Sequence, residues 1–122
     1  MKIQLSTPIG NVVTGQGKGW VRVGTHEYRA PIVLTSDAIV EGFAPGGFDA
    51  LTEADFATLL AHEPEVVLLG TGATHRFPHP RLTRALVEAR VGVEVMDTAA
   101  ACRTFNILAA EGRKVTAVLL FD

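Results

Sequence analysis

Residues 68–80, which read LLGTGATHRFPHP, contain the densest group of residues that could do chemistry. An apolar run leads into Gly-Thr-Gly, and a short loop with two histidines, an arginine and two prolines follows. Backbone amides beside such glycines can face an anion, and an arginine adds positive charge. The glycines could equally serve only to turn the chain as it leaves a buried strand. The candidate binding residues of this loop are Gly70, Thr71, Gly72, His75 and Arg76.

Two more specific interpretations of this loop lack their required context. A dinucleotide-binding fingerprint needs a third glycine at position 75 and a helix that begins at once, but residue 75 is His. A metal site would use His75 and His79, which lie four apart on a segment that Pro78 and Pro80 keep extended. The loop contains no Asp, Glu or Cys to complete a coordination shell. We therefore expect no metal and no cofactor.

A second group of candidates lies in residues 97–106, DTAAACRTFN. Arg103 and Asn106 are one helical turn apart, so they could contact a ligand or a partner chain, be solvated, or cap a nearby carbonyl. Cys102 is expected to be a small buried hydrophobe, and the alternative is a thiol activated by the helix start and Arg103. Asp97 is accounted for as a helix N-cap. No catalytic set emerges.

The first 50 residues are predicted to form strands and loops. Gly15–Gly19, GQGKG, is a cluster of turn-forming residues that predicts a hairpin. Pro31 limits its position to a strand start or an edge, because proline has no donor for the sheet. Phe43 and Phe48, in a Gly/Pro-rich loop, are expected to cover part of the core. The predicted extended segments are residues 11–14, 20–23 and 26–35.

From residue 51 onward, helices are predicted to alternate with strands. Thr52 and Asp97 are expected N-caps, while Pro64 and Gly112 end the helices that follow those caps. The predicted helices cover residues 52–63, 79–90 and 97–112, and the predicted strands cover 65–70, 91–96 and 114–121. The side chains expected on buried helix faces are Phe56, Leu59, Leu60, Leu82, Leu86, Val87, Ala101, Phe105, Leu108 and Ala109.

This order of elements predicts an α/β fold in one three-layer domain over residues 1–122. The central sheet should be mixed and mostly parallel, flanked by helices, with an N-terminal antiparallel β portion. Loops that leave the carboxyl ends of parallel strands share one edge of the sheet. We therefore expect Gly70–His79 and Asp97–Thr98 to lie on the same side, where ligands usually bind in such folds.

Composition excludes several classes of protein. The 122 residues carry a formal net charge of -2 with no run of like charge, which argues against nucleic-acid binding. No apolar run is long enough for stable membrane insertion, and the start, MKIQLSTPIG, lacks the apolar region of a secretory signal. A single cysteine allows no internal disulfide. We expect a cytoplasmic protein, and the oligomeric state stays open.

Three segments resemble a known family: PIVLTSDAIVEGF, VVLLGTGATHRFPHP and GVEVMDTAAACRTFNILAAEGRKVTAVLL, which together run from about residue 31 to residue 120. The chain resembles a family of small domains of unknown function that includes the mitochondrial complex I assembly factor three and the adipogenesis-associated Mth-domain protein. The resemblance implies a small α/β domain. It also implies a role as a helper in building the respiratory NADH dehydrogenase, with no catalytic residues to transfer. An Arg/Ser-rich presequence is lacking, so an organelle role is not expected.

Two functional hypotheses follow. The first is a non-catalytic binding protein, an assembly factor or chaperone-like helper for a respiratory NADH dehydrogenase complex. Its partner surface would be the edge built from Gly70–His79 and Asp97–Asn106. The alternative is a small anionic-ligand-binding protein or enzyme with a pocket at the same edge. That pocket would use Arg76, Arg103 and the helix starts, with Cys102 as a possible participant.

Overall fold

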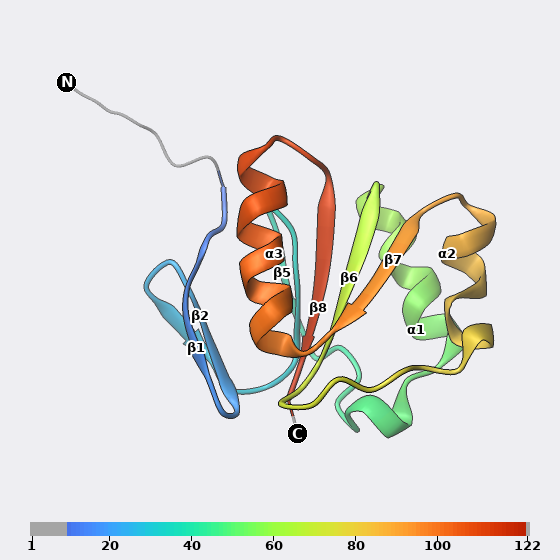
Figure 1. Ribbon diagram of the computed structural model, residues 1–122, viewed down its shortest axis with the longest axis horizontal. Coiled ribbons are helices and arrows are strands. Elements are labelled where there is room, and N and C mark those ends of the chain that lie inside the picture. Colours follow the sequence, from blue (N-terminus) through green and yellow to red (C-terminus); the bar gives the residue numbers. More distant parts are fainter. Residues whose placement is uncertain (1–9, 122) are drawn as a thin grey trace.

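The computed structural model describes residues 10–121 (Figure 1). The strands in this part of the chain are β1 (Val13–Gly17), β2 (Trp20–Val23), β3 (His26–Tyr28), β4 (Ile32–Leu34), β5 (Ile39–Glu41), β6 (Val66–Thr71), β7 (Gly92–Met96) and β8 (Val115–Leu120). The α-helices are α1 (Glu53–Thr58), α2 (Arg84–Glu88) and α3 (Thr98–Ala110). Three short 3-10 helices complete the elements: η1 (Phe48–Ala50), η2 (Leu59–His62) and η3 (Pro80–Thr83).

Five strands form a mixed central sheet in the order β5-β4-β8-β6-β7. β6 is parallel to both β7 and β8, whereas β4 is antiparallel to both β8 and β5. The expected mixed α/β sheet is confirmed: the strands of the second half supply its parallel pairs, and the N-terminal half supplies its antiparallel ones. All residues of β6 and β8 are buried, as is typical of strands that are covered on both faces.

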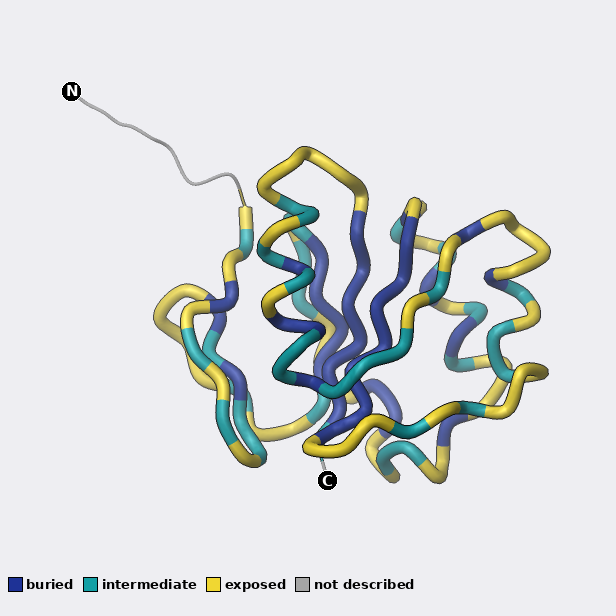
Figure 2. The backbone as a smooth tube through the Cα atoms, in the orientation of Figure 1, coloured by how far each residue is buried: buried dark blue, intermediate teal, exposed yellow. Residues whose placement is uncertain are grey.

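Alternating side chains of the central strands pack on two different layers. On one face, Leu68, Ala117 and Leu119 contact α3 together with the small N-terminal sheet. On the other face, Val67, Leu69 and Val118 contact α1, η2 and α2. Figure 1 shows α3 on the side of β1 and β2, with α1 and α2 beyond β7. Figure 2 shows that the buried residues are concentrated along the central strands, which gives the expected three layers.

β1, β2 and β3 form a separate antiparallel sheet, and here the predicted boundaries were wrong in part. β1 continues through Gly17, so the hairpin turn is only Lys18 and Gly19 rather than all of Gly15–Gly19. The extended segment predicted for residues 26–35 divides into β3 and β4, which belong to different sheets. Pro31 lies just before β4, where its missing N–H costs no sheet bond. β5 was not predicted.

The predicted helix over residues 79–90 was also wrong in detail. It begins as the 3-10 helix η3, and α2 covers only Arg84–Glu88. Leu86 is fully buried, but Val87, which we expected on the buried face, is 62% exposed. A 3-10 turn has about 3.0 residues rather than 3.6, so the apolar face shifts and residues beyond Leu86 turn toward solvent.

The predicted N-caps at Thr52 and Asp97 were correct, although the helix predicted over residues 52–63 is α1 only through Thr58 and continues as the 3-10 helix η2. Thr52 and Asp55 form a reciprocal capping box at α1, with bonds of 2.9 and 3.1 Å. The Asp97 carboxylate accepts from the Ala100 amide at 2.8 Å and caps α3. Phe43 is buried against the α1 side of the sheet, and Phe48 packs beside it. Within residues 10–121, no helix combines the length and apolar character that crossing a membrane would need.

Asn106 fastens the N-terminal sheet to α3. Its side-chain amide donates to the Val13 carbonyl at 2.8 Å, and its carbonyl oxygen accepts from the Val13 amide at 2.9 Å. The side-chain amide thus forms the same pair of hydrogen bonds with Val13 that a backbone residue of a neighbouring strand would form. Of the alternatives open from the sequence, the structure shows an internal contact with backbone groups. Packing of Val13, Val21 and Val23 against the α3 side accompanies it.

Replacing Asn106 by Ala should remove both hydrogen bonds and lower the free energy of unfolding by about 2 kcal/mol, since each such bond contributes about 1 kcal/mol. Urea unfolding followed by circular dichroism measures this change. Amide hydrogen exchange should accelerate most at Val13. The control is Ile107→Ala on the neighbouring exposed position, for which we expect a much smaller loss. Equal stability of the Asn106→Ala variant and the native protein would contradict this account of the connection.

Candidate functional site

The carboxyl ends of β6 and β8 meet the start of α3 around the buried hydroxyl of Thr98. Thr98 Oγ1 donates to the Leu120 carbonyl at 2.7 Å and accepts from the Gly72 amide at 2.8 Å. The Thr98 amide in turn donates to the Gly72 carbonyl at 2.9 Å. The loop after β6 and the start of α3 therefore lie on one side, as the parallel topology predicted. We call this side of the sheet the carboxyl edge.

Gly70 and Gly72 have different structural reasons to be glycine. A Cβ at Gly70 would lie 3.0 Å from the Ala101 Cβ and 3.0 Å from both Cα and Oγ1 of Thr98. Gly70 thus allows α3 to approach β6 closely. Gly72 has a φ of 99°, which side-chain-bearing residues rarely adopt. The simpler interpretation, in which the glycines only turn the chain, therefore fits Gly72, whereas Gly70 is explained by packing.

Thr71 and Arg76 shape the loop that follows β6. Thr71 is fully buried, and its hydroxyl donates to the Thr74 carbonyl at 2.7 Å and accepts from the Arg76 amide at 3.1 Å. The Arg76 guanidinium donates to the Thr71 carbonyl at 2.7 and 3.2 Å and lies 4.5 Å from the centre of the Phe48 ring. Arg76 is therefore engaged in holding the loop against η1.

The two histidines of this loop make contacts within the chain: His75 packs against a neighbouring ring, and His79 caps a 3-10 helix. The rings of His75 and Phe77 lie 4.4 Å apart, and Phe77 is 77% exposed. His79 accepts from the Arg81 amide through Nδ1 at 3.1 Å, which makes it the N-cap of η3. Among residues 10–121, no group of three or more His, Cys, Asp or Glu side chains is placed to hold a metal ion.

The candidates on α3 differ in how far they are buried. Cys102 is buried, with 3% exposure, as expected for a small core residue. Burial raises the pKa of the Cys102 thiol to about 11, against a smaller lowering by the Arg103 guanidinium. The thiol is therefore protonated near neutral pH, which disfavours the activated thiol that was the alternative for Cys102. Arg103 is exposed.

A cavity of about 570 Å³ opens at the carboxyl edge, between the first hairpin and α3. Of the sequence candidates, Gly72 and Asp97 line it, whereas Arg76, Cys102 and Asn106 do not. Its other lining residues are Gln16, Gly17, Lys18, Gly19, Ala73, Thr98, Ala99 and Phe121. The contribution of Lys18 was missed, because nothing in the local sequence shows that a hairpin turn lies beside a helix start some 80 positions later.

Comparison with known proteins identifies close relatives. The family model described as "Protein of unknown function (DUF498/DUF598)" matches residues 13–120. The "NADH dehydrogenase [ubiquinone] 1 alpha subcomplex assembly factor 3" of Danio rerio is 42% identical over 97% of this chain and 68% of its own length. The bovine protein of the same name is 31% identical over 97% of this chain. The chain spans only 65% of that bovine relative.

Solved structures agree with the fold. A crystal structure of a protein from Bordetella parapertussis superposes with a TM-score of 0.84 at 37% identity, covering 97% of this chain and all of the other. A solution structure from Bordetella pertussis, described as a Mth938-like domain, gives a TM-score of 0.67 at 31% identity, covering 98% of this chain and 90% of that one. The overall fold is therefore shared with these experimentally determined structures.

Replacing Gly70 by Ala should force β6 and α3 apart and lower the free energy of unfolding by about 1–3 kcal/mol, the usual cost of overpacking. Gly92→Ala is the matched control, because a Cβ there meets its nearest neighbour only at 3.7 Å. We expect that variant to stay within about 0.5 kcal/mol of the native protein. Denaturant unfolding of the two variants measures the difference. Equal effects at the two glycines would contradict the close approach of α3.

Proposed function

Because this chain belongs to the DUF498/DUF598 family of proteins of unknown function, we propose that it is a non-catalytic protein-binding module that assists assembly of a respiratory NADH dehydrogenase. The observation that carries the proposal is 42% identity, over 97% of this chain, to a protein named as an assembly factor of that complex. Since the chain spans only 65% of the bovine relative, the proposal concerns the shared domain. Its cytoplasmic location is part of the same proposal.

The polar groups at the carboxyl edge support binding rather than catalysis. Asp97 caps α3, Thr98 bonds to Leu120 and Gly72, and Arg76 bonds to Thr71. An enzyme of the acyl- or phosphoryl-transfer type would need a nucleophile beside a base, or a set of donors aimed at a reacting atom. Among residues 10–121 the only thiol, that of Cys102, is buried with a raised pKa.

The proposed partner surface is the carboxyl edge from Gly70 to His79 and from Asp97 to Asn106. Phe77 projects from a loop that the Arg76 contacts hold in place, and it is largely exposed. An exposed aromatic ring on a fixed backbone loses little conformational freedom when it is buried, which is a property of residues that dominate protein interfaces. Arg103 and His75 are exposed on the same two segments and would add polar contacts.

Cross-linked affinity purification from the protein's own host, read by quantitative mass spectrometry, tests the proposal. We expect subunits of the NADH dehydrogenase to be enriched with the native protein. Phe77→Ser should lower their recovery about tenfold, because loss of a dominant contact costs at least about 2 kcal/mol. Val87→Ser is the matched control: it removes another largely exposed apolar side chain, from α2, and should leave recovery unchanged.

The outcomes separate the function from its surface. If no subunit of the complex is enriched with the native protein, the assembly role is wrong. If subunits are enriched equally with the native and Phe77→Ser proteins, the role stands but the loop of Phe77 is not the interface. If Val87→Ser alone lowers recovery, the interface lies at α2 instead.

The carboxyl-edge cavity favours a second candidate function, binding of a small anion. The positive end of the α3 dipole lies at this cavity and the ammonium of Lys18 adds positive charge, while the Asp97 carboxylate on the lining is engaged in capping the helix. This differs from the residues we expected, because Arg76 is engaged with Thr71 and Cys102 is buried.

Thermal unfolding with inorganic phosphate, pyrophosphate and nucleoside monophosphates tests that second candidate. A ligand at 100 times its Kd should add about 2.7 kcal/mol of stability and raise the Tm. Lys18→Ala should reduce the shift, while Lys114→Ala, at the opposite end of β8, should leave it unchanged. Unchanged melting with every anion would count against the small-ligand function.

A further inference from the structure

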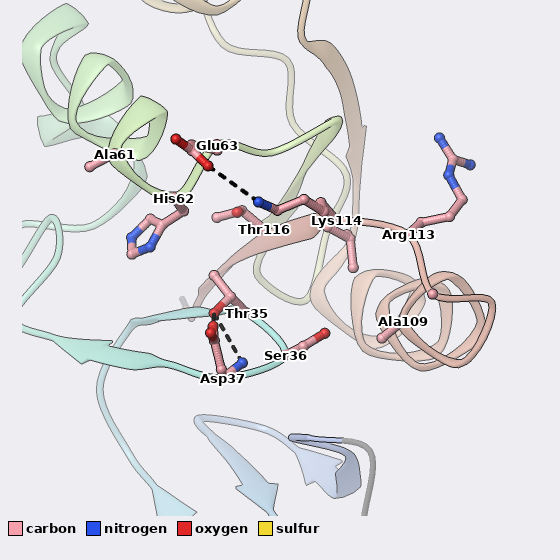
Figure 3. Close-up of a pocket in the computed structure, with 12 residues that line it drawn as sticks. Thr35, Ser36, Asp37, Ala61, His62, Glu63, Ala109, Arg113, Lys114 and Thr116 are labelled. Atoms are coloured by element: carbon pink, nitrogen blue, oxygen red, sulfur yellow. Dashed lines mark hydrogen bonds and ion pairs between the residues drawn. The ribbon is translucent and has the colours of Figure 1, made fainter.

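A second cavity, of about 540 Å³, lies at the opposite end of the sheet from the carboxyl edge (Figure 3). The pairing of β4 with β8 ends at Leu34 and Ala117. The next residues along the two chains, Thr35 just after β4 and Thr116 in β8, do not pair with each other. The cavity opens where the two segments separate. The ends of η2 and α3 form its sides. Figure 3 shows Thr35, His62 and Thr116 around a common space.

Thr116 provides an unusual polar group in this cavity. Its side chain is 1% exposed, yet its hydroxyl has no hydrogen-bond partner among residues 10–121. Buried hydroxyl groups in proteins almost always have a partner, and leaving one without costs free energy. Valine would fit the same strand position without that cost. The hydroxyl therefore indicates a polar occupant of the cavity.

The charges around the cavity determine the sign of that occupant. Lys114 Nζ lies 3.4 Å from Glu63 Oε1, and Arg113 Nε lies 3.3 Å from Glu65 Oε1, so both cations at the mouth are neutralised by carboxylates. The Asp37 carboxylate accepts from the Thr35 hydroxyl at 3.0 Å and has no cationic partner in the described part of the chain. Among the charged side chains that line the cavity in the described part of the chain, Asp37 is thus the one without an ion-pair partner.

We propose that this cavity binds a small primary amine in its ammonium form. An ammonium group has three donors, and the cavity supplies acceptors in the Asp37 carboxylate, the Thr116 hydroxyl oxygen and the His62 ring. Asp37 also supplies the counter-charge, which an anionic ligand would find repulsive. Ala61 and Ala109 supply apolar surface at the two sides of the cavity. The volume is within the range of small-molecule sites.

Titration of the isotope-labelled protein, followed by two-dimensional proton–nitrogen NMR, tests the site with n-butylammonium as the probe. We expect saturable shifts of the amides of Thr35, Asp37 and Thr116, with a Kd on the order of millimolar for so small a ligand. Butyrate and 1-butanol have the same chain with a negative or neutral head group. Neither should shift these amides in a saturable way.

Variants assign the roles. Asp37→Asn should raise the Kd for n-butylammonium about tenfold, and Thr116→Val, which keeps the shape of the strand residue, should raise it severalfold. Asp49→Asn, which neutralises an exposed carboxylate on η1, is the matched control and should leave the Kd unchanged. Before each titration, a well-dispersed proton–nitrogen NMR spectrum of the variant would establish that it is folded.

Three outcomes would overturn the amine site. Equal saturable shifts with 1-butanol would mean that the head group is not recognised. An unchanged Kd in Asp37→Asn would show that the Asp37 carboxylate is not the counter-charge for the ammonium group. The absence of any saturable shift with n-butylammonium would contradict amine binding in this cavity. None of these outcomes bears on the affinity purification, so the two proposals fail independently.

Discussion

The fold depends on how closely α3 lies against the central sheet. The Thr98 hydroxyl bonds to the ends of β6 and β8 at once, through Gly72 and Leu120, and so fixes the first turn of α3 over the ends of both strands. Gly70 and Ala101 leave room for that approach, since a single added methyl group at Gly70 would already crowd the helix. A hydroxyl that is fully bonded in this way can be buried at little cost, and it specifies one position for the helix.

Fixing α3 has consequences far along the chain. Because the helix axis is set at Thr98, Asn106 two turns later is held at the distance where it can pair with both backbone groups of Val13. That contact attaches the N-terminal sheet, whose valines complete the core on the α3 side. The hairpin turn at Lys18 then lies beside the start of α3 and closes the carboxyl-edge cavity. The cavity is thus a product of helix placement rather than of any local motif.

The sequence predicted best what short-range interactions decide. Caps at Thr52 and Asp97, and the fully buried strands β6 and β8, depend on neighbours a few residues away or on burial alone, and they were correct. The division of residues 26–35 between two sheets depends on partners from distant parts of the chain. Val87 was misplaced because helical periodicity was assumed through a 3-10 turn. These features have no local signal.

Candidate site residues were harder to interpret, for a physical reason. Arg76 and Asn106 carry the groups that bind ligands, but the same donors and acceptors satisfy backbone groups at Thr71 and Val13. Residue type alone does not distinguish these uses, because a backbone carbonyl and a ligand oxygen are equivalent acceptors. The distinguishing signal is a polar group that the fold leaves unsatisfied. At the carboxyl edge, Thr98 has all its partners within the chain, and what remains for partners is exposed surface. At the opposite end the Thr116 hydroxyl is buried with no partner among residues 10–121, so the two ends of the sheet are suited to different kinds of recognition.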